Sequence, residues 1–191
     1  MNYIKYYWLE RDFFPEIYNF FHDKGYLTPE HFFSIIIWKS NYNKPSIKRG
    51  LLSSGKSLGE TVYNLTKRIN EALSKEDRLE IFIGDEKKKD RQGGFQLAMA
   101  SAILTALYPD NFSIYDWRVR SQLKHPQKLN RKFPDISYSH NRVKQYFEEY
   151  IPQVLKTGRK ISKNPNLSLR DCDRLLWAKS WHEDLRDFLE K

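Results

Sequence analysis

Two adjacent glycines and a later aspartate are the residues whose types and spacing could support chemistry. Gly93 and Gly94 precede a run of small and apolar residues over 96–108, and Asp116 follows shortly after that run. Glycine permits backbone conformations and close approaches that a Cβ would block, and the Ala/Ser spacing behind it lets another helix sit close. A carboxylate at a helix start can stabilise a developing positive charge or orient a water molecule. We therefore expect a glycine hairpin, a tightly packed helix and a carboxylate at the head of the next helix.

Basic side chains flank both features. Before the glycines they are Lys87, Lys88, Lys89 and Arg91; after Asp116 they are Arg118 and Arg120, and then Lys124, His125, Lys128, Arg131 and Lys132. These cations could contact a phosphate backbone, although a charge run such as 86–91 can equally form a solvated loop. Arg118 and Arg120 could also pair with Asp116, which would keep its carboxylate ionised.

This order of hairpin, small-residue helix and aspartate resembles the helix-hairpin-helix DNA glycosylase superfamily, which includes the 8-oxoguanine, adenine and 3-methyladenine glycosylases. The resemblance covers residues 90–120 and implies an all-α, glycosylase-like fold. It implies that the hairpin around Gly93, Gly94 and Gln96 binds a DNA phosphate through backbone N–H groups. It also implies that Asp116 supports cleavage of the base–sugar bond. Similar small proteins occur in bacterial antiviral gene clusters, so the resemblance allows a role in DNA repair or in antiviral defence.

The chain departs from the family pattern at two positions. If Gly94 is the first hairpin glycine, Gln96 replaces the second glycine, and Ala98 stands where the lyase-competent members carry a nucleophilic lysine. A Schiff base requires an amine, so β-lyase chemistry through that position is excluded. Cys172 is the single cysteine, which excludes the branch with an iron–sulfur cluster. The implied activity is that of a monofunctional N-glycosylase without a cofactor.

A phosphate-binding pattern elsewhere in the chain suggests a different hypothesis, a P-loop NTPase. Residues 50–57 fit GxxxxGK[ST], and residues 80–86 faintly resemble the acidic strand that holds magnesium in such enzymes. A P-loop needs a buried strand before it and a helix after it. Residues 43–49 are too polar and basic for a buried strand. We expect a flexible basic turn that is capped by Ser57.

Composition favours a helical domain with a polyanionic partner. Apolar residues make up 40% of the 191 positions, which is ample for a core. The formal charge of +9 favours DNA, or RNA, as the partner. The chain has no apolar run of about 18 residues, so no membrane partner is expected. One cysteine and scattered histidines indicate no metal site and favour a cytoplasmic location.

Apolar periodicity predicts helices throughout a single domain over residues 1–191, or two helical halves flanking a cleft near residues 90–120. The expected helices span 12–24, 29–39, 57–73, 74–83, 96–108, 115–123, 139–160 with a bend near Pro152, and 168–180 followed by a short turn to Phe188. Ser74 and Asp77 resemble a capping box. Asp171, Asp173 and Arg174 are expected to form an ion-pair cluster on the last long helix, or to close a cleft opposite Asp116.

Asp116 also has a purely structural interpretation. Aspartate is a favoured N-cap, so its carboxylate could serve only the helix that follows. The second hypothesis is accordingly a non-catalytic module that binds nucleic acid or protein and keeps the fold without the chemistry. Gln96 and Ala98 favour this module, whereas the presence of Asp116 favours the enzyme.

Overall fold

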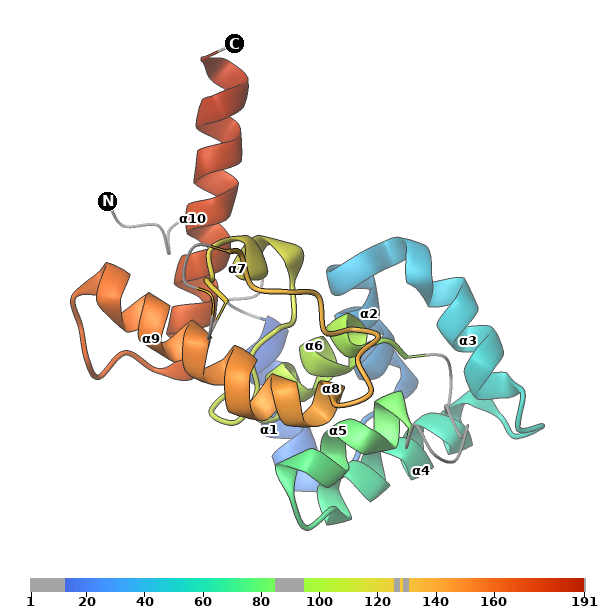
Figure 1. Ribbon diagram of the computed structural model, residues 1–191. Coiled ribbons are helices and arrows are strands. Elements are labelled where there is room, and N and C mark those ends of the chain that lie inside the picture. The colour runs from blue at the N-terminus through green and yellow to red at the C-terminus, as the bar shows by residue number, and fades with distance from the viewer. Residues whose placement is uncertain (1–12, 85–94, 126–127, 129–130, 191) are drawn as a thin grey trace. The chain divides into compact units, whose positions relative to one another are not determined.

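The computed structural model describes residues 13–84, 95–125, 128 and 131–190, and over these residues the protein is all-helical (Figure 1). They contain no strand, and a single isolated bridge pairs Lys124 with Lys132. Within the same residues, no helix is long and apolar enough to cross a membrane. The predicted all-α class is therefore confirmed for the described part of the chain.

The described residues form two compact units, which meet in the sequence between Tyr108 and Pro109. The N-terminal unit spans Phe13–Tyr108. The C-terminal unit contains residues 109–190. The small-residue helix thus belongs to one unit and Asp116 to the other.

The N-terminal unit is built around one buried helix. Its elements are α1 (Phe13–Lys24), α2 (Pro29–Ser40), the 3₁₀ turn η2 (Asn41–Asn43), α3 (Lys44–Leu52), α4 (Leu58–Glu71), α5 (Lys75–Ile83) and α6 (Leu97–Leu107). Helices α1, α2 and α5 pack against α6 (Figure 1). Every α6 residue except Ala98 is buried. Small side chains at Ala100, Ser101 and Ala102 allow this close packing, as the sequence predicts for residues 96–108.

Helix starts in this unit follow the cap signals. Ser57 accepts a hydrogen bond from the Glu60 N–H at the start of α4. Ser74 and Asp77 form the predicted capping box of α5, in which each side chain accepts from the other residue's backbone N–H. These bonds satisfy N–H groups that the helix itself leaves without partners.

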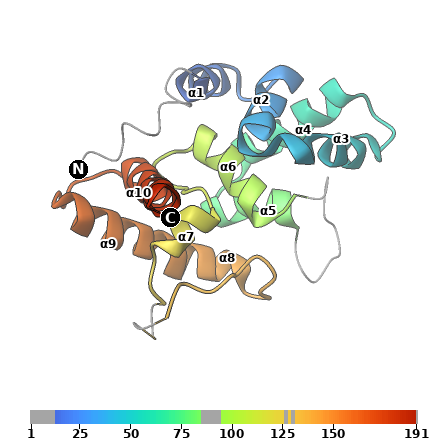
Figure 2. The same ribbon diagram turned by 90° about the horizontal axis from the view of Figure 1, so that it is seen from above.

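The C-terminal unit contains α7 (Trp117–Ser121), α8 (Arg142–Gln145), the π turn η3 (Tyr146–Tyr150), α9 (Ile151–Ser162) and α10 (Leu169–Leu189). Helix α10 packs against α9 and α7, which lie side by side with it in Figure 2. The contact with α9 is close at Gly158, where a Cβ would lie 2.5 Å from the Cβ of Cys172.

Three expected elements differ in the structure. Residues 44–52, which are not among the expected helices, form α3, in which Ile47 and Leu51 are buried, so the expected basic turn is limited to residues 53–56 before the Ser57 cap. The predicted bend in 139–160 takes the form of the π turn just before Pro152, whose missing N–H disturbs the α-helical ladder. Helix α10 continues without a break to Leu189.

Candidate functional site

Asp116 is the N-cap of α7. Its Oδ1 accepts a hydrogen bond of 2.9 Å from the Arg118 N–H, and its side chain is partly buried. The predicted capping role of Asp116 is thus confirmed. Capping occupies one carboxylate oxygen and fixes the orientation of the group.

The extended segment that leads into Asp116 is completely buried. It comprises Phe112, Ser113, Ile114 and Tyr115, each at most 4% exposed. An extended segment cannot satisfy its own backbone groups, so buried partners must come from elsewhere in the fold. We call those partners, Tyr146, Tyr150 and Asp173, the polar frame.

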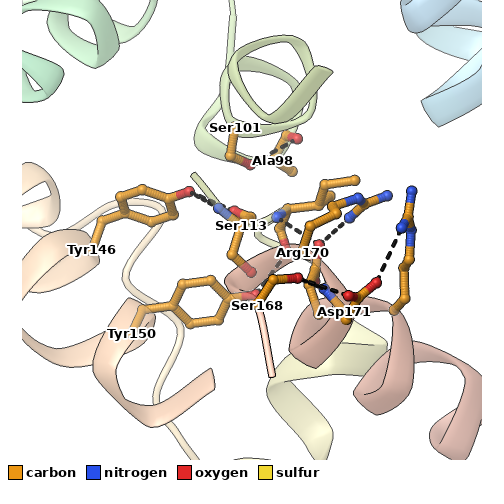
Figure 3. Close-up of polar contacts among 11 residues, drawn as sticks. Ala98, Ser101, Ser113, Tyr146, Tyr150, Ser168, Arg170 and Asp171 are labelled. Carbon is orange, nitrogen blue, oxygen red and sulfur yellow. Dashed lines mark hydrogen bonds and ion pairs between the residues drawn. The ribbon is translucent and has the colours of Figure 1, made fainter. Parts of the chain in front are cut away.

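Each member of the polar frame bonds a different part of the segment. The Tyr146 hydroxyl accepts from the Ser113 N–H at 3.0 Å and donates to the carbonyl of the same residue (Figure 3). The Tyr150 hydroxyl donates to the Ile114 carbonyl at 2.7 Å. Asp173 Oδ2 accepts from the Ile114 N–H at 3.2 Å. Both the N–H and the carbonyl of Ile114, two residues before Asp116, are therefore hydrogen-bonded to buried side chains.

The ionised Asp173 and the protonated Tyr146 and Tyr150 are suited to bonding the buried backbone. Asp173 forms a buried ion pair with Arg170, so its carboxylate is not left alone in the interior. Burial raises the pKa of the Tyr146 and Tyr150 phenols well above the ordinary value, and the Asp173 charge raises the pKa of both further. Both phenols accordingly stay protonated and can donate hydrogen bonds near neutral pH.

Arg118 and Arg120 form their ion pairs with other carboxylates. Arg118 pairs with Asp184 on α10, and its guanidinium lies 4.4 Å from the Trp117 ring centroid. Arg120 pairs with Asp135 at 3.0 Å. The sequence suggests Asp116 as their partner, but it contains no signal for these pairs, which join residues distant along the chain. Both arginines lie on the short helix that Asp116 caps.

Tyr115 links the segment to the Asp135 loop. Its hydroxyl donates to Asp135 Oδ1 at 3.0 Å and accepts from the Ile136 N–H at 2.9 Å. Burial raises the pKa of Tyr115 to about 12. The residue just before Asp116 is thus fixed by its side chain as well as by its backbone neighbours.

The expected phosphate-binding residues lie mostly outside the described part of the chain. Those outside it are Gly93, Gly94, Lys87, Lys88, Lys89 and Arg91. Gln96 is described: it is the N-cap of α6, and its side chain makes no capping hydrogen bond. Together with Ala98 and Met99 it lines a pocket of about 250 Å³ whose other wall includes Lys39, Ser40, Asn43 and Ser46. Gln96 and Ala98, the two residues that depart from the glycosylase pattern, therefore line one small polar pocket in the N-terminal unit.

The phosphate-binding pattern at residues 50–57 does not have P-loop geometry. Helix α3 precedes it where a P-loop requires a strand, and residues 80–83 belong to helix α5. The pattern instead spans the end of α3, a turn with Gly55 at φ +76°, and the N-cap of α4. Among the described residues, no group of three or more His, Cys, Asp or Glu side chains could hold a metal ion.

The polar frame is the part of the site that sequence reasoning missed. Its members lie 33 to 59 positions from the segment they bind, beyond the reach of any periodicity argument. One signal was present, because Tyr146 and Tyr150 are four residues apart on a predicted helix and buried tyrosines usually find a hydrogen-bond partner. Asp173 was expected in an ion-pair cluster, and its partner is Arg170, while Arg174 pairs with Asp171.

Comparison with known proteins adds nothing to this description. No family model, no curated protein and no solved structure matches the chain. The function must therefore be argued from the residues themselves.

Proposed function

We propose that the protein binds nucleic acid and acts as a monofunctional N-glycosylase that excises a flipped, modified base, in DNA repair or antiviral defence in the cytoplasm. The observation that carries the proposal is the position of Asp116. A partly buried carboxylate stands at a helix start, on a segment whose backbone is fixed by three buried side chains. Preorganisation of this kind is what electrostatic catalysis requires.

Hydrolysis of the base–sugar bond requires from the protein mainly a fixed negative charge near the sugar. Hydrolysis breaks the C1′–N bond, joins a water oxygen to C1′, and returns a proton from that water to the departing base. Positive charge develops on the sugar during this step, and an ionised Asp116 would stabilise it or orient the water. Ala98 offers no amine for a Schiff base, so the product strand would stay intact at the abasic site.

Nucleic-acid binding is supported by charge rather than by a described interface. The formal charge of +9 favours a polyanion. Exposed basic residues follow α7 closely at Lys124, Lys128, Arg131 and Lys132. Flipping a base out of the stack costs a few kcal/mol, which phosphate contacts of this kind would help to offset.

The test is base release by the wild type and by Asp116→Asn. Asparagine can still accept the hydrogen bond from the Arg118 N–H, so the cap and most DNA affinity should remain. Release should nevertheless fall by about 100-fold or more, because the charge is lost. The substrates are duplexes with oxidised, alkylated, deaminated or deazaguanine bases, and strand breaks are scored with and without alkali.

Asp187→Asn is the matched control, since it removes an exposed carboxylate from the same unit. It should release base at the wild-type rate. Absence of release from every substrate, or equal release by Asp116→Asn, would reject the enzyme.

The second candidate is a non-catalytic binding module with a similar fold. The observation that favours it is the capping hydrogen bond of Asp116, which gives the residue a structural role without any chemistry. In that case, DNA affinity would persist while no base is released from any substrate.

A further inference from the structure

A groove in the N-terminal unit carries the phosphate-binding sequence pattern in a different structural setting. It has a volume of about 630 Å³ and lies between the end of α3, the turn at residues 53–56 and one face of α4. That volume is within the range of ligand sites, roughly 300–1,000 Å³. The polar side chains that line it include Ser53, Ser54, Lys56, Asn64, Lys67 and Arg68.

The charge of the groove favours an anion. Three of its lining residues are cationic, whereas Glu71 is its one acidic lining residue. Two of the cations take part in ion pairs that are exposed and long: Lys56 Nζ lies 3.4 Å from Glu60, and Lys67 Nζ lies 3.9 Å from Glu71. Exposed pairs of this kind contribute little, so a multivalent anion can displace them.

The turn itself does not act as a P-loop. The Ser53 N–H donates to the Gly50 carbonyl and the Gly55 N–H to the Leu52 carbonyl, so these N–H groups already terminate α3. The Ser53 and Ser54 hydroxyls also donate to α3 carbonyls, which leaves their oxygens as acceptors. The lysine, arginine and asparagine side chains that line the groove are its donors for an anion. Side chains that recognise phosphate in this way provide charge and hydrogen bonds without a magnesium site.

We propose that the α3–α4 groove binds phosphate groups through Lys56, Asn64, Lys67 and Arg68, without hydrolysing them. Phosphate of this kind has two sources, a nucleic-acid backbone and a free nucleotide. The inference does not depend on Asp116, which belongs to the other unit.

The experiment compares a groove variant with a control of equal charge. Lys67→Gln with Arg68→Gln removes two groove cations, and Lys44→Gln with Lys48→Gln removes two exposed cations of α3 that do not line the groove. The probes are a fluorescein-labelled 12-nucleotide single strand, the matching duplex, ATP and inorganic tripolyphosphate. Binding is followed by anisotropy and by amide resonances of Ser54 and Asn64, and circular dichroism checks that all proteins keep their helicity.

For a nucleic-acid backbone, the groove variant should lose about tenfold or more in oligonucleotide affinity at low salt. The slope of log affinity against log salt should also fall by about 1 to 2. For a free nucleotide, ATP and tripolyphosphate should shift the Ser54 and Asn64 resonances, compete with one another and remain intact. Equal losses in the groove and control variants, or no shift with any probe, would overturn the proposal. Base release by the wild type is scored separately, so failure here leaves the glycosylase proposal untouched.

Discussion

The polar frame around the Asp116 segment and the α3–α4 groove organise polar groups in opposite ways. In the frame, Tyr146, Tyr150 and Asp173 are buried, and each makes a specific hydrogen bond to one short stretch of backbone. In the groove, Lys56 in the turn and Lys67 and Arg68 on α4 are exposed to solvent. The frame fixes the backbone that leads into a single carboxylate, whereas the groove presents three exposed cations.

This difference has an energetic consequence. A buried polar group that loses its partner costs about 1–3 kcal/mol, and a buried charge costs more. An exposed ion pair contributes about 0–1 kcal/mol. Substitutions in the frame should therefore act on folding, and substitutions in the groove should act on binding.

The largest effect is expected from Asp173→Ala. The change leaves the Arg170 guanidinium buried without its carboxylate and removes the acceptor of the Ile114 N–H. The free energy of unfolding should fall by about 3–5 kcal/mol. Urea unfolding followed by circular dichroism measures it. Asp187→Ala, on the exposed part of the same helix, is the control and should change stability by less than about 0.5 kcal/mol. Similar free energies of unfolding for the two variants would show that the polar frame does not stabilise the fold.

The next largest effect is expected from alkaline pH, which should weaken both the Tyr115 hydrogen bonds and the polar frame. The folded-state pKa of Tyr115 is about 12, above the ordinary value near 10, so the folded protein holds this proton more tightly than the unfolded chain does. Stability from this group is complete below pH 10 and is lost as pH rises through 12, by roughly 2–3 kcal/mol in all. The raised pKa values of Tyr146 and Tyr150 act in the same direction.

The measurement is urea unfolding between pH 8 and pH 11.5, with tyrosinate absorbance recorded in parallel. Tyr42 is 96% exposed and provides an internal reference for ordinary titration. If all the tyrosines titrate together near pH 10 while the protein remains folded, the frame is accessible to water and the comparison fails.

A smaller effect is expected from Gly158→Ala, which tests the packing of α9 on α10. The new Cβ would lie 2.5 Å from Cys172 Cβ and 2.8 Å from its Cα, so backbone must move. We expect a loss of about 1–3 kcal/mol. Gly59→Ala in α4 is the matched control, because nothing lies within 4 Å of its Cβ position. That variant should gain up to about 1 kcal/mol from helix propensity, and thermal unfolding of the two proteins gives the comparison. Stability changes of opposite sign in the two variants would confirm the close packing at Gly158, and equal losses would contradict it.

Sequence reasoning worked best where the signal is local. Ser74 and Asp77 are three residues apart, and their capping box follows from residue types alone. The small residues of 96–108 likewise predict a buried helix, since only close packing uses such a surface. No helix was predicted over residues 44–52, because their charges and Pro45 conceal the apolar pair Ile47 and Leu51.

The candidate site was less accessible to such reasoning. Asp116 and its place at a helix start could be found from the sequence, but the partners of its neighbours could not. Arg118 was suggested to pair with the nearby Asp116, and its ion pair is with Asp184, 66 positions away. The carboxylate that pairs with an arginine is determined by distances in the folded protein, whereas periodicity predicts only which face of a helix a residue lies on.

The sequence by itself therefore determined the helical class, the caps, the buried α6 and the candidate carboxylate, because each follows from residues within a few positions of one another. Only the tertiary structure decided that Tyr146, Tyr150 and Asp173 hold the segment before Asp116, and that residues 50–57 border a groove rather than a P-loop. The physical reason is that backbone groups of a buried extended segment must be satisfied by whichever side chains the packing of distant helices brings to them.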